Sequence, residues 1–119
     1  MNAKGIGEDG EGQLVVRGED VGDRGCHLTL AGELDMASAP LVRQAVDDAV
    51  ARGRTEVTID AARVTFIDSS ALVVILTARS DLAESGGTVH LTNASAPVTR
   101  ILEIAMLTDL LIDRSGDEP

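Results

Sequence analysis

The chain has 119 residues, which fits one compact domain, and its 44% hydrophobic and 25% charged residues have the balance of a globular protein. Twenty Asp and Glu stand against ten Lys and Arg, so the formal net charge is −10, and aromatic residues amount to 1%. This composition argues against nucleic acid and anionic membranes as direct partners, because both require a surplus of Lys and Arg and single strands also require aromatic rings for stacking.

Both ends of the chain are polar. Residues 1–12 are rich in Gly and acidic residues, which predicts a flexible N-terminal segment. Residues 115–119 have a similar composition, which predicts a frayed C-terminus. One domain is therefore expected over 13–114. Because the N-terminus lacks the apolar stretch of a signal peptide and no run reaches about 20 apolar residues, we expect a cytoplasmic protein that does not span a membrane.

Two short β-like runs open the domain. They cover 14–20 and 26–32, and the Gly- and Asp-rich cluster between them is typical of a hairpin connection. The second run contains the single cysteine, Cys26, which excludes an internal disulfide and is expected to be a small buried hydrophobe.

Helices and strands then alternate. Apolar residues recur at helical spacing after Ser38, a candidate N-cap, and this first helix is expected to end at Gly53. Residues 61–67 are interpreted as a connection between a strand and the most apolar helix. The expected elements are helix 38–52, strand 55–60, helix 69–85, strand 88–92, helix 95–106 and strand 109–112.

The resulting order is ββαβαβαβ. Strands separated by helices of this length favour parallel pairing through right-handed crossovers, while the opening hairpin adds an antiparallel edge. We therefore predict an α/β domain with a mixed, mostly parallel β-sheet and helices packed against it.

Enzyme signatures are weak. His27 follows Cys26 on one strand, so the two side chains point to opposite faces and cannot chelate a metal together, and His90 lies on another strand. The sequence has no Gly-x-Ser-x-Gly elbow, Walker loop or Gly-x-Gly-x-x-Gly. We predict a protein that is not an enzyme and carries no metal or cofactor, with a hydrolase using Ser69 and a distant His as the weakest alternative.

The segment FIDSSAL, residues 66–72, carries the strongest functional signal. Asp68 or Ser69 is expected to cap the apolar helix that follows, but a helix needs only one cap. A spare serine at a helix N-terminus lies where amide donors and the positive end of the dipole stabilise an added phosphate. The segment therefore also predicts a phosphorylation switch.

Glu33 and Asp35 follow the second predicted strand, in an expected loop. They serve either to stabilise the turn by local hydrogen bonds or to contact a partner, and the residues alone leave both interpretations open.

These residues resemble the STAS domain family, specifically the stand-alone anti-sigma-factor antagonists of bacteria. The likeness runs from Leu14 to Ile112 through LAGELDMASAPLVRQAV, VTIDAARVTFIDSSALVVIL and GGTVHLTNASAPVTRILEIAMLTDLL. The middle stretch is the most specific, since the family carries a strand ending in Asp, an aromatic-apolar pair and then Asp-Ser-Ser/Thr-Gly-Leu. The matching residues are Asp60, Phe66, Ile67, Asp68, Ser69, Ser70 and Leu72.

The resemblance implies a partner switch. The unphosphorylated antagonist would bind an anti-sigma factor that is also a serine kinase with a histidine-kinase-like ATPase fold, which frees a sigma factor. Phosphorylation at Ser69 would reverse this, and a PP2C-type phosphatase would restore binding. ATP and magnesium would belong to the kinase, and the free antagonist would be a monomer. The implied partner-binding residues are Glu33, Leu34, Asp35, Asp68, Ser69, Ser70, Ala71 and Leu72.

Two residues depart from the family pattern. Ala71 replaces the glycine that usually follows the two hydroxyls, which would add a methyl group near the phosphorylation site. The glycine usual at the end of the third helix is replaced within 105–107, which makes a left-handed cap there unfavourable. A scaffolding or ligand-sensing STAS module without phosphorylation is therefore the alternative function.

Overall fold

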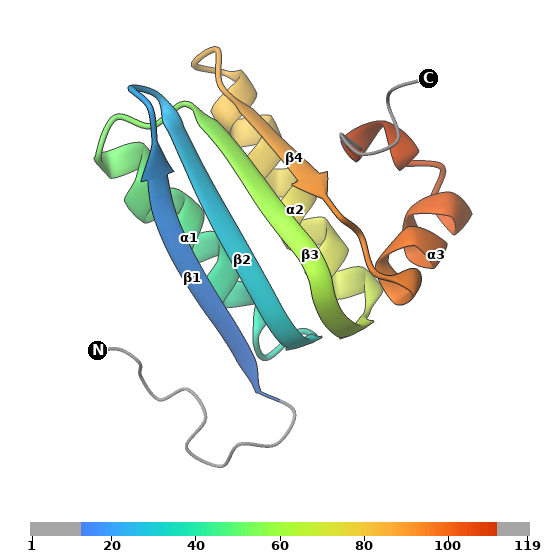
Figure 1. The fold of residues 1–119 in the computed structure, drawn as a ribbon. Helices are drawn as coiled ribbons and strands as arrows, with labels where there is room; N and C mark the ends of the chain where they lie inside the picture. Colours follow the sequence, from blue (N-terminus) through green and yellow to red (C-terminus); the bar gives the residue numbers. More distant parts are fainter. Residues whose placement is uncertain (1–12, 112–119) are drawn as a thin grey trace.

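A four-stranded sheet in the order β1-β2-β3-β4 organises the protein, whose computed structural model describes residues 13–111 (Figure 1). The first pair of strands is antiparallel and the other two pairs are parallel. The prediction of an α/β domain with a mostly parallel mixed sheet is confirmed, while the predictions for 1–12 and 115–119 lie outside the described residues. The elements are β1 (Leu14–Val21), β2 (Gly25–Leu34), α1 (Ala39–Ala51), β3 (Glu56–Ile67), α2 (Ser69–Ala83), β4 (Thr88–Thr92), α3 (Ala96–Ile104) and a 3-10 turn (Thr108–Leu110).

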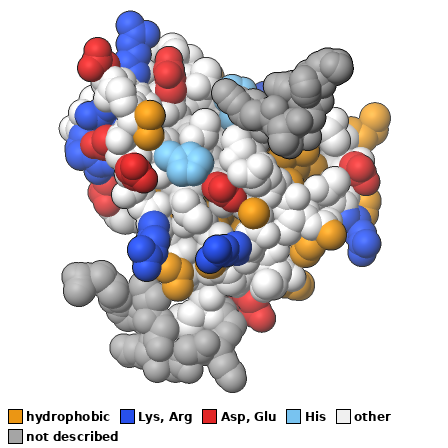
Figure 2. Space-filling view, in the orientation of Figure 1, with side chains coloured by type: hydrophobic (Ala, Val, Ile, Leu, Met, Phe, Trp, Pro, Cys, Tyr) orange, Lys and Arg blue, Asp and Glu red, His pale blue; other side chains and the backbone are white. Residues whose placement is uncertain are grey.

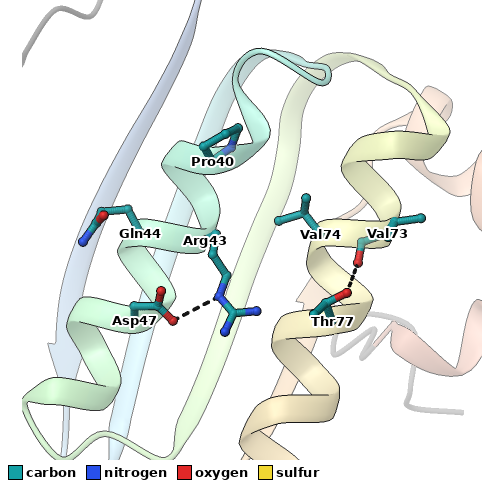
Figure 3. Close-up of a pocket in the computed structure, with 7 residues that line it drawn as sticks. All are labelled: Pro40, Arg43, Gln44, Asp47, Val73, Val74 and Thr77. Atoms are coloured by element: carbon teal, nitrogen blue, oxygen red, sulfur yellow. Dashed lines mark hydrogen bonds and ion pairs between the residues drawn. The ribbon is translucent and has the colours of Figure 1, made fainter.

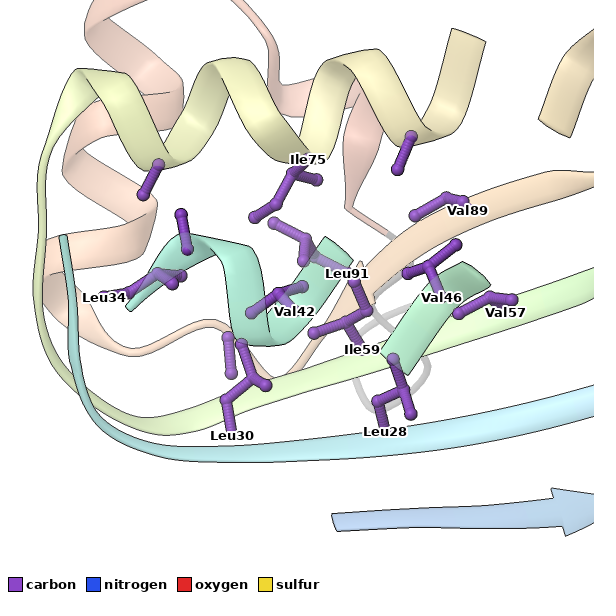
Figure 4. Close-up of a cluster of buried hydrophobic side chains, with 14 of the residues drawn as sticks. Leu28, Leu30, Leu34, Val42, Val46, Val57, Ile59, Ile75, Val89 and Leu91 are labelled. Atoms are coloured by element: carbon purple, nitrogen blue, oxygen red, sulfur yellow. The ribbon is translucent and has the colours of Figure 1, made fainter. Parts of the chain in front are cut away.

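Helices α1 and α2 cover one face of the sheet, and the hydrophobic core lies between them and the strands (Figures 1 and 4). Alternate strand residues point into this layer because side chains alternate across a strand. Burial of each Leu, Ile or Val stabilises the fold by about 1.5–3 kcal/mol. Figure 4 labels Leu28, Leu30, Leu34, Val42, Val46, Val57, Ile59, Ile75, Val89 and Leu91 in this core.

Strands β2 and β3 are both longer than predicted. Residues 61–67, predicted as a connection, continue β3, and Glu33 and Leu34 are the last residues of β2. The pairing shifts register between Thr29 and Ala31 and again after Gly32, and such irregularities break the alternation by which a strand is recognised in sequence. The ladder then ends at the pair Leu34 and Ile67, so β2 and β3 finish side by side.

The prediction of a last strand over 109–112 is wrong. Residues Thr108–Leu110 form a 3-10 turn whose Leu110 side chain is buried, and only Leu111 pairs with the sheet, through one parallel bridge to Leu91. Burial of Leu110 and the ion pair of Asp109 with Arg79 on α2, at 3.1 Å, hold this segment as a turn. Ile112 lies outside the described residues.

Helix α3 ends in a left-handed cap even though glycine is absent there. Met106 has φ +60°, and the amides of Leu107 and Met106 donate to the carbonyls of Leu102 (2.8 Å) and Glu103 (3.1 Å). This is the Schellman pattern of hydrogen bonds. The doubt about a left-handed cap at 105–107 is corrected, because the cap forms: the two hydrogen bonds hold Met106 in a conformation that still costs an L-residue about 1–2 kcal/mol.

Substitution Met106→Gly is therefore expected to stabilise the protein by about 1 kcal/mol, because it relieves the left-handed strain and removes a side chain that is 85% exposed. Urea unfolding measures this change. The control Ala105→Gly, at φ −83°, should destabilise instead. A loss of stability in Met106→Gly comparable with that of the control would contradict the prediction.

Candidate functional site

The N-terminus of α2 lies at the edge of the sheet where β2 and β3 both end. The backbone amide of Asp68 donates to the carbonyl of Leu34 at 3.2 Å, which joins the turn after β3 to the end of β2. The Oδ1 of Asp68 accepts hydrogen bonds from the Ala71 amide at 3.0 Å and from the Ser70 hydroxyl at 2.7 Å. Asp68 is therefore the N-cap of α2, which settles the choice between Asp68 and Ser69.

These hydrogen bonds also set the charge at the site. The Ser70 hydroxyl, followed by the backbone amides of Ala71, Met36 and Ser70, lowers the pKa of Asp68 below its ordinary value against a smaller opposing effect of burial. The carboxyl group is consequently ionised at neutral pH. Because one of the amides belongs to Met36, the loop after β2 faces the same carboxylate.

Ser69 differs from Ser70 in its exposure and in its hydrogen bonds to the described residues. It is the first residue of α2 and is exposed, and its hydroxyl makes no hydrogen bond to any residue within 13–111. Ser70, in contrast, is half-buried and its hydroxyl donates to Asp68. Amides of the first helical turn and the positive end of the helix dipole favour an added anion at this position.

The loop after β2 is held by Ser38. Its hydroxyl donates to the carbonyl of Glu33 at 2.8 Å and accepts from the amide of Asp35 at 2.9 Å, while its amide donates to Asp35 Oδ1 at 2.9 Å. Ser38 occupies the predicted N-cap position of α1, although its side chain makes no cap hydrogen bond to the helix. The turn-stabilising role of Asp35 is confirmed.

Three of the predicted partner-binding residues are buried. Leu34 is the last residue of β2 and is 1% exposed. On the inner face of α2, Ala71 is 0% exposed and Leu72 is 5% exposed. Their side chains pack beneath the surface that Ser69 shares with the loop, and a partner-binding role for these three residues stays a prediction. The methyl group of Ala71 consequently faces the core and does not crowd Ser69.

Two exposed apolar side chains at this edge were missed by the sequence analysis. Met36 in the loop after β2 is 70% exposed, and Phe66, which pairs with Glu33 across the two strands, is 47% exposed. For Met36 the available signal was a large apolar side chain in a loop, a common position for protein contact, whereas Phe66 lies within β3 and gave no such signal.

The histidines lie elsewhere. His27, Thr58 and His90 occupy one row across β2, β3 and β4, with His27 Nδ1 3.0 Å from Thr58 Oγ1. Ile67, at the end of β3, lies nine positions beyond Thr58, which is roughly 30 Å along the strand. The structure therefore brings neither histidine to Ser69. Among residues 13–111 there is no group of three His, Cys, Asp or Glu side chains placed to hold a metal ion.

No helix in the described part of the chain is long and apolar enough to cross a membrane.

Comparison with known proteins places the chain in a family. A family model described as "Mlab, STAS domain" matches residues 7–113. An anti-sigma F factor antagonist from Paenibacillus polymyxa is 31% identical over 85 residues, which is 71% of this chain and 73% of that protein. Among solved structures, the unphosphorylated anti-sigma factor antagonist SpoIIAA has a TM-score of 0.75 at 24% identity and covers 87% of this chain and 91% of its own. The phosphorylated form of the Bacillus cell fate determinant SpoIIAA has a TM-score of 0.69 at 23% identity, with 87% and 95% covered. The chain therefore belongs to the STAS domain family, and the resemblance seen in its sequence is confirmed.

Proposed function

We propose that the chain is an anti-sigma-factor antagonist controlled by phosphorylation at Ser69. In its unphosphorylated form it binds an anti-sigma factor that is a serine kinase with a histidine-kinase-like ATPase fold, and this binding releases a sigma factor in the cytoplasm. The observation that carries the proposal is the exposed Ser69 hydroxyl, free of hydrogen bonds to the described residues, at the first position of α2 and next to the ionised Asp68.

The geometry favours Ser69 over Ser70 as the phosphate acceptor. In the transfer, the Ser69 oxygen forms a bond to the γ-phosphorus of ATP, which the kinase holds, and the hydroxyl proton is lost. The bond between the γ-phosphorus and the oxygen of the β-phosphate breaks, and ADP leaves. Ser70 Oγ is 2.7 Å from Asp68 Oδ1 and is occupied as a donor. A PP2C-type phosphatase reverses the step by hydrolysis, so this chain is the substrate of both enzymes and needs no cofactor of its own.

A phosphate at Ser69 would change the charge of the surface that meets the partner. The phosphate carries a charge of about −1.5 to −2 at neutral pH. Asp68 is already negative, and Asp35 lies on the adjoining loop. The partner-facing surface consists of Glu33, Asp35, Met36, Asp68, Ser69 and Ser70, supported from beneath by Leu34, Ala71 and Leu72. Added negative charge against a closed interface weakens the complex.

Labelling with radioactive ATP tests the acceptor. A purified kinase-type anti-sigma factor from the same genome is expected to label the wild-type chain and the Ser70→Ala variant to a similar extent, and to leave Ser69→Ala without label. Ser70→Ala is the matched control, because it removes a hydroxyl one residue away. Label on Ser69→Ala, or its loss in Ser70→Ala alone, would contradict the assignment.

A further inference from the structure

A groove of about 470 Å³ runs between α1 and α2, on the side of the helices that faces away from the sheet (Figure 3). Its α1 side is formed by Pro40, Arg43, Gln44 and Asp47, and its α2 side by Val73, Val74 and Thr77. Val73 is 58% exposed, an unusual degree for a valine on a helix that packs on a core. The Thr77 hydroxyl donates to the carbonyl of Val73 at 2.8 Å, so it offers no free donor to a ligand.

One arginine spans the groove and ties the two helices together. The guanidinium of Arg43 contacts Asp47 on α1 at 3.1 Å and Asp81 on α2 at 2.6 Å. Its charge is thus balanced within the chain. Asp47 and Asp81 carry two negative charges against the one positive charge of Arg43, so the rim keeps one unbalanced negative charge.

The groove is continuous with the surface that carries Ser69. Residues four apart lie on one face of a helix, so Val73 stands one turn below Ser69 on α2. On α1, Pro40 follows two residues after Ser38, which holds the loop of the partner-facing surface. A protein that covers Ser69 is therefore in reach of both walls.

We propose that this groove receives a basic amphipathic helix of the anti-sigma factor, whose apolar side chains pack on Val73, Val74 and Pro40 and whose Lys or Arg side chains face Asp47 and Asp81. This inference rests on the proposed function and adds a contact that does not involve Ser69. Helices pack by inserting side chains into the groove between neighbouring helices, which suits two helices lying side by side. The acidic rim selects a basic partner.

Two substitutions in the groove test the proposal against the wild-type complex with a purified kinase-type anti-sigma factor. Val73→Lys places a cation on the apolar wall, and Thr77→Arg fills the groove with a cation; each is expected to raise the dissociation constant at least tenfold. Both positions are exposed, so the variants should keep the wild-type circular dichroism spectrum. Val50→Lys is the matched control: Val50 is a 43% exposed valine on α1 outside the groove, and its variant should bind within about twofold of wild type.

The same titration separates this proposal from the proposed function. If Ser69→Asp loses binding while Val73→Lys and Thr77→Arg bind like wild type, the groove proposal is overturned and the switch at Ser69 stands. If the wild-type chain binds no kinase-type anti-sigma factor, the proposed function fails and the groove proposal fails with it. Weaker binding by both groove variants, with Val50→Lys binding like wild type, supports the groove proposal.

Discussion

The substitution Ser69→Asp is expected to weaken the complex with a kinase-type anti-sigma factor at least a hundredfold, whereas Ser69→Ala should bind within about threefold of wild type. The aspartate adds a negative charge at the first position of α2, directly after the ionised Asp68. In a closed interface this charge loses its water and gains no partner, and such unpaired charges cost about 2–5 kcal/mol. Tenfold in affinity corresponds to about 1.4 kcal/mol, so a hundredfold loss lies within this range.

Isothermal titration measures this affinity, and Ser80→Asp is the matched control. Ser80 is an exposed serine on the same helix, eleven residues further along, so its variant carries the same charge outside the partner-facing surface. It should bind within about twofold of wild type. Equal binding by Ser69→Asp and wild type would favour the alternative of a scaffolding or ligand-sensing STAS module without phosphorylation.

The substitution Gly32→Ala is expected to destabilise the fold by at least about 3 kcal/mol. Gly32 has φ +119°, a conformation that L-residues rarely adopt, and an added Cβ would lie 2.0 Å from the carbonyl oxygen of Gln13. Backbone must therefore move in β1, β2 or both, and the unfavourable φ adds about 1–3 kcal/mol. Gly32 also stands where the β2–β3 register shifts, directly before Glu33 and Leu34 at the partner-facing edge.

Gly22 provides the control for Gly32. It lies in the turn after β1 at φ +64°, and a Cβ there would meet nothing within 4 Å. Gly22→Ala is therefore expected to cost only the conformational part, about 1 kcal/mol. Urea unfolding gives the loss of stability of each variant, and the difference between the two losses is the cost of the steric clash at Gly32. Equal losses of unfolding free energy in Gly32→Ala and Gly22→Ala would show that the close approach of Gln13 to Gly32 does not add to the cost of the substitution.

The fold followed from sequence wherever hydrophobic periodicity was undisturbed. Strand β4 was predicted with its observed bounds, and α1 and α2 to within a few residues. The prediction failed at the second half of β3, where register shifts remove the alternation. It also failed at Asp109 and Leu110, which form part of a 3-10 turn, because the ion pair of Asp109 and the burial of Leu110 depend on contacts with distant residues.

The candidate site was located by sequence but not resolved. FIDSSAL indicated one cap and one spare hydroxyl, yet only the 2.7 Å contact of Ser70 with Asp68 shows which of the two serine hydroxyls is already a donor. Likewise, the inward position of Ala71 depends on how α2 packs. The groove was not predictable at all, since its walls come from residues 40–47 and 73–77, which meet only when both helices cross the same face of the sheet.

Native mass spectrometry of the wild-type chain mixed with a kinase-type anti-sigma factor, before and after addition of ATP and magnesium, shows whether phosphorylation of Ser69 releases the partner. We expect a complex before ATP, and afterwards a free chain heavier by one phosphate, with the modified residue mapped to Ser69. A complex that persists with the phosphate in place, or a phosphate mapped to another residue, would rule out a switch at Ser69.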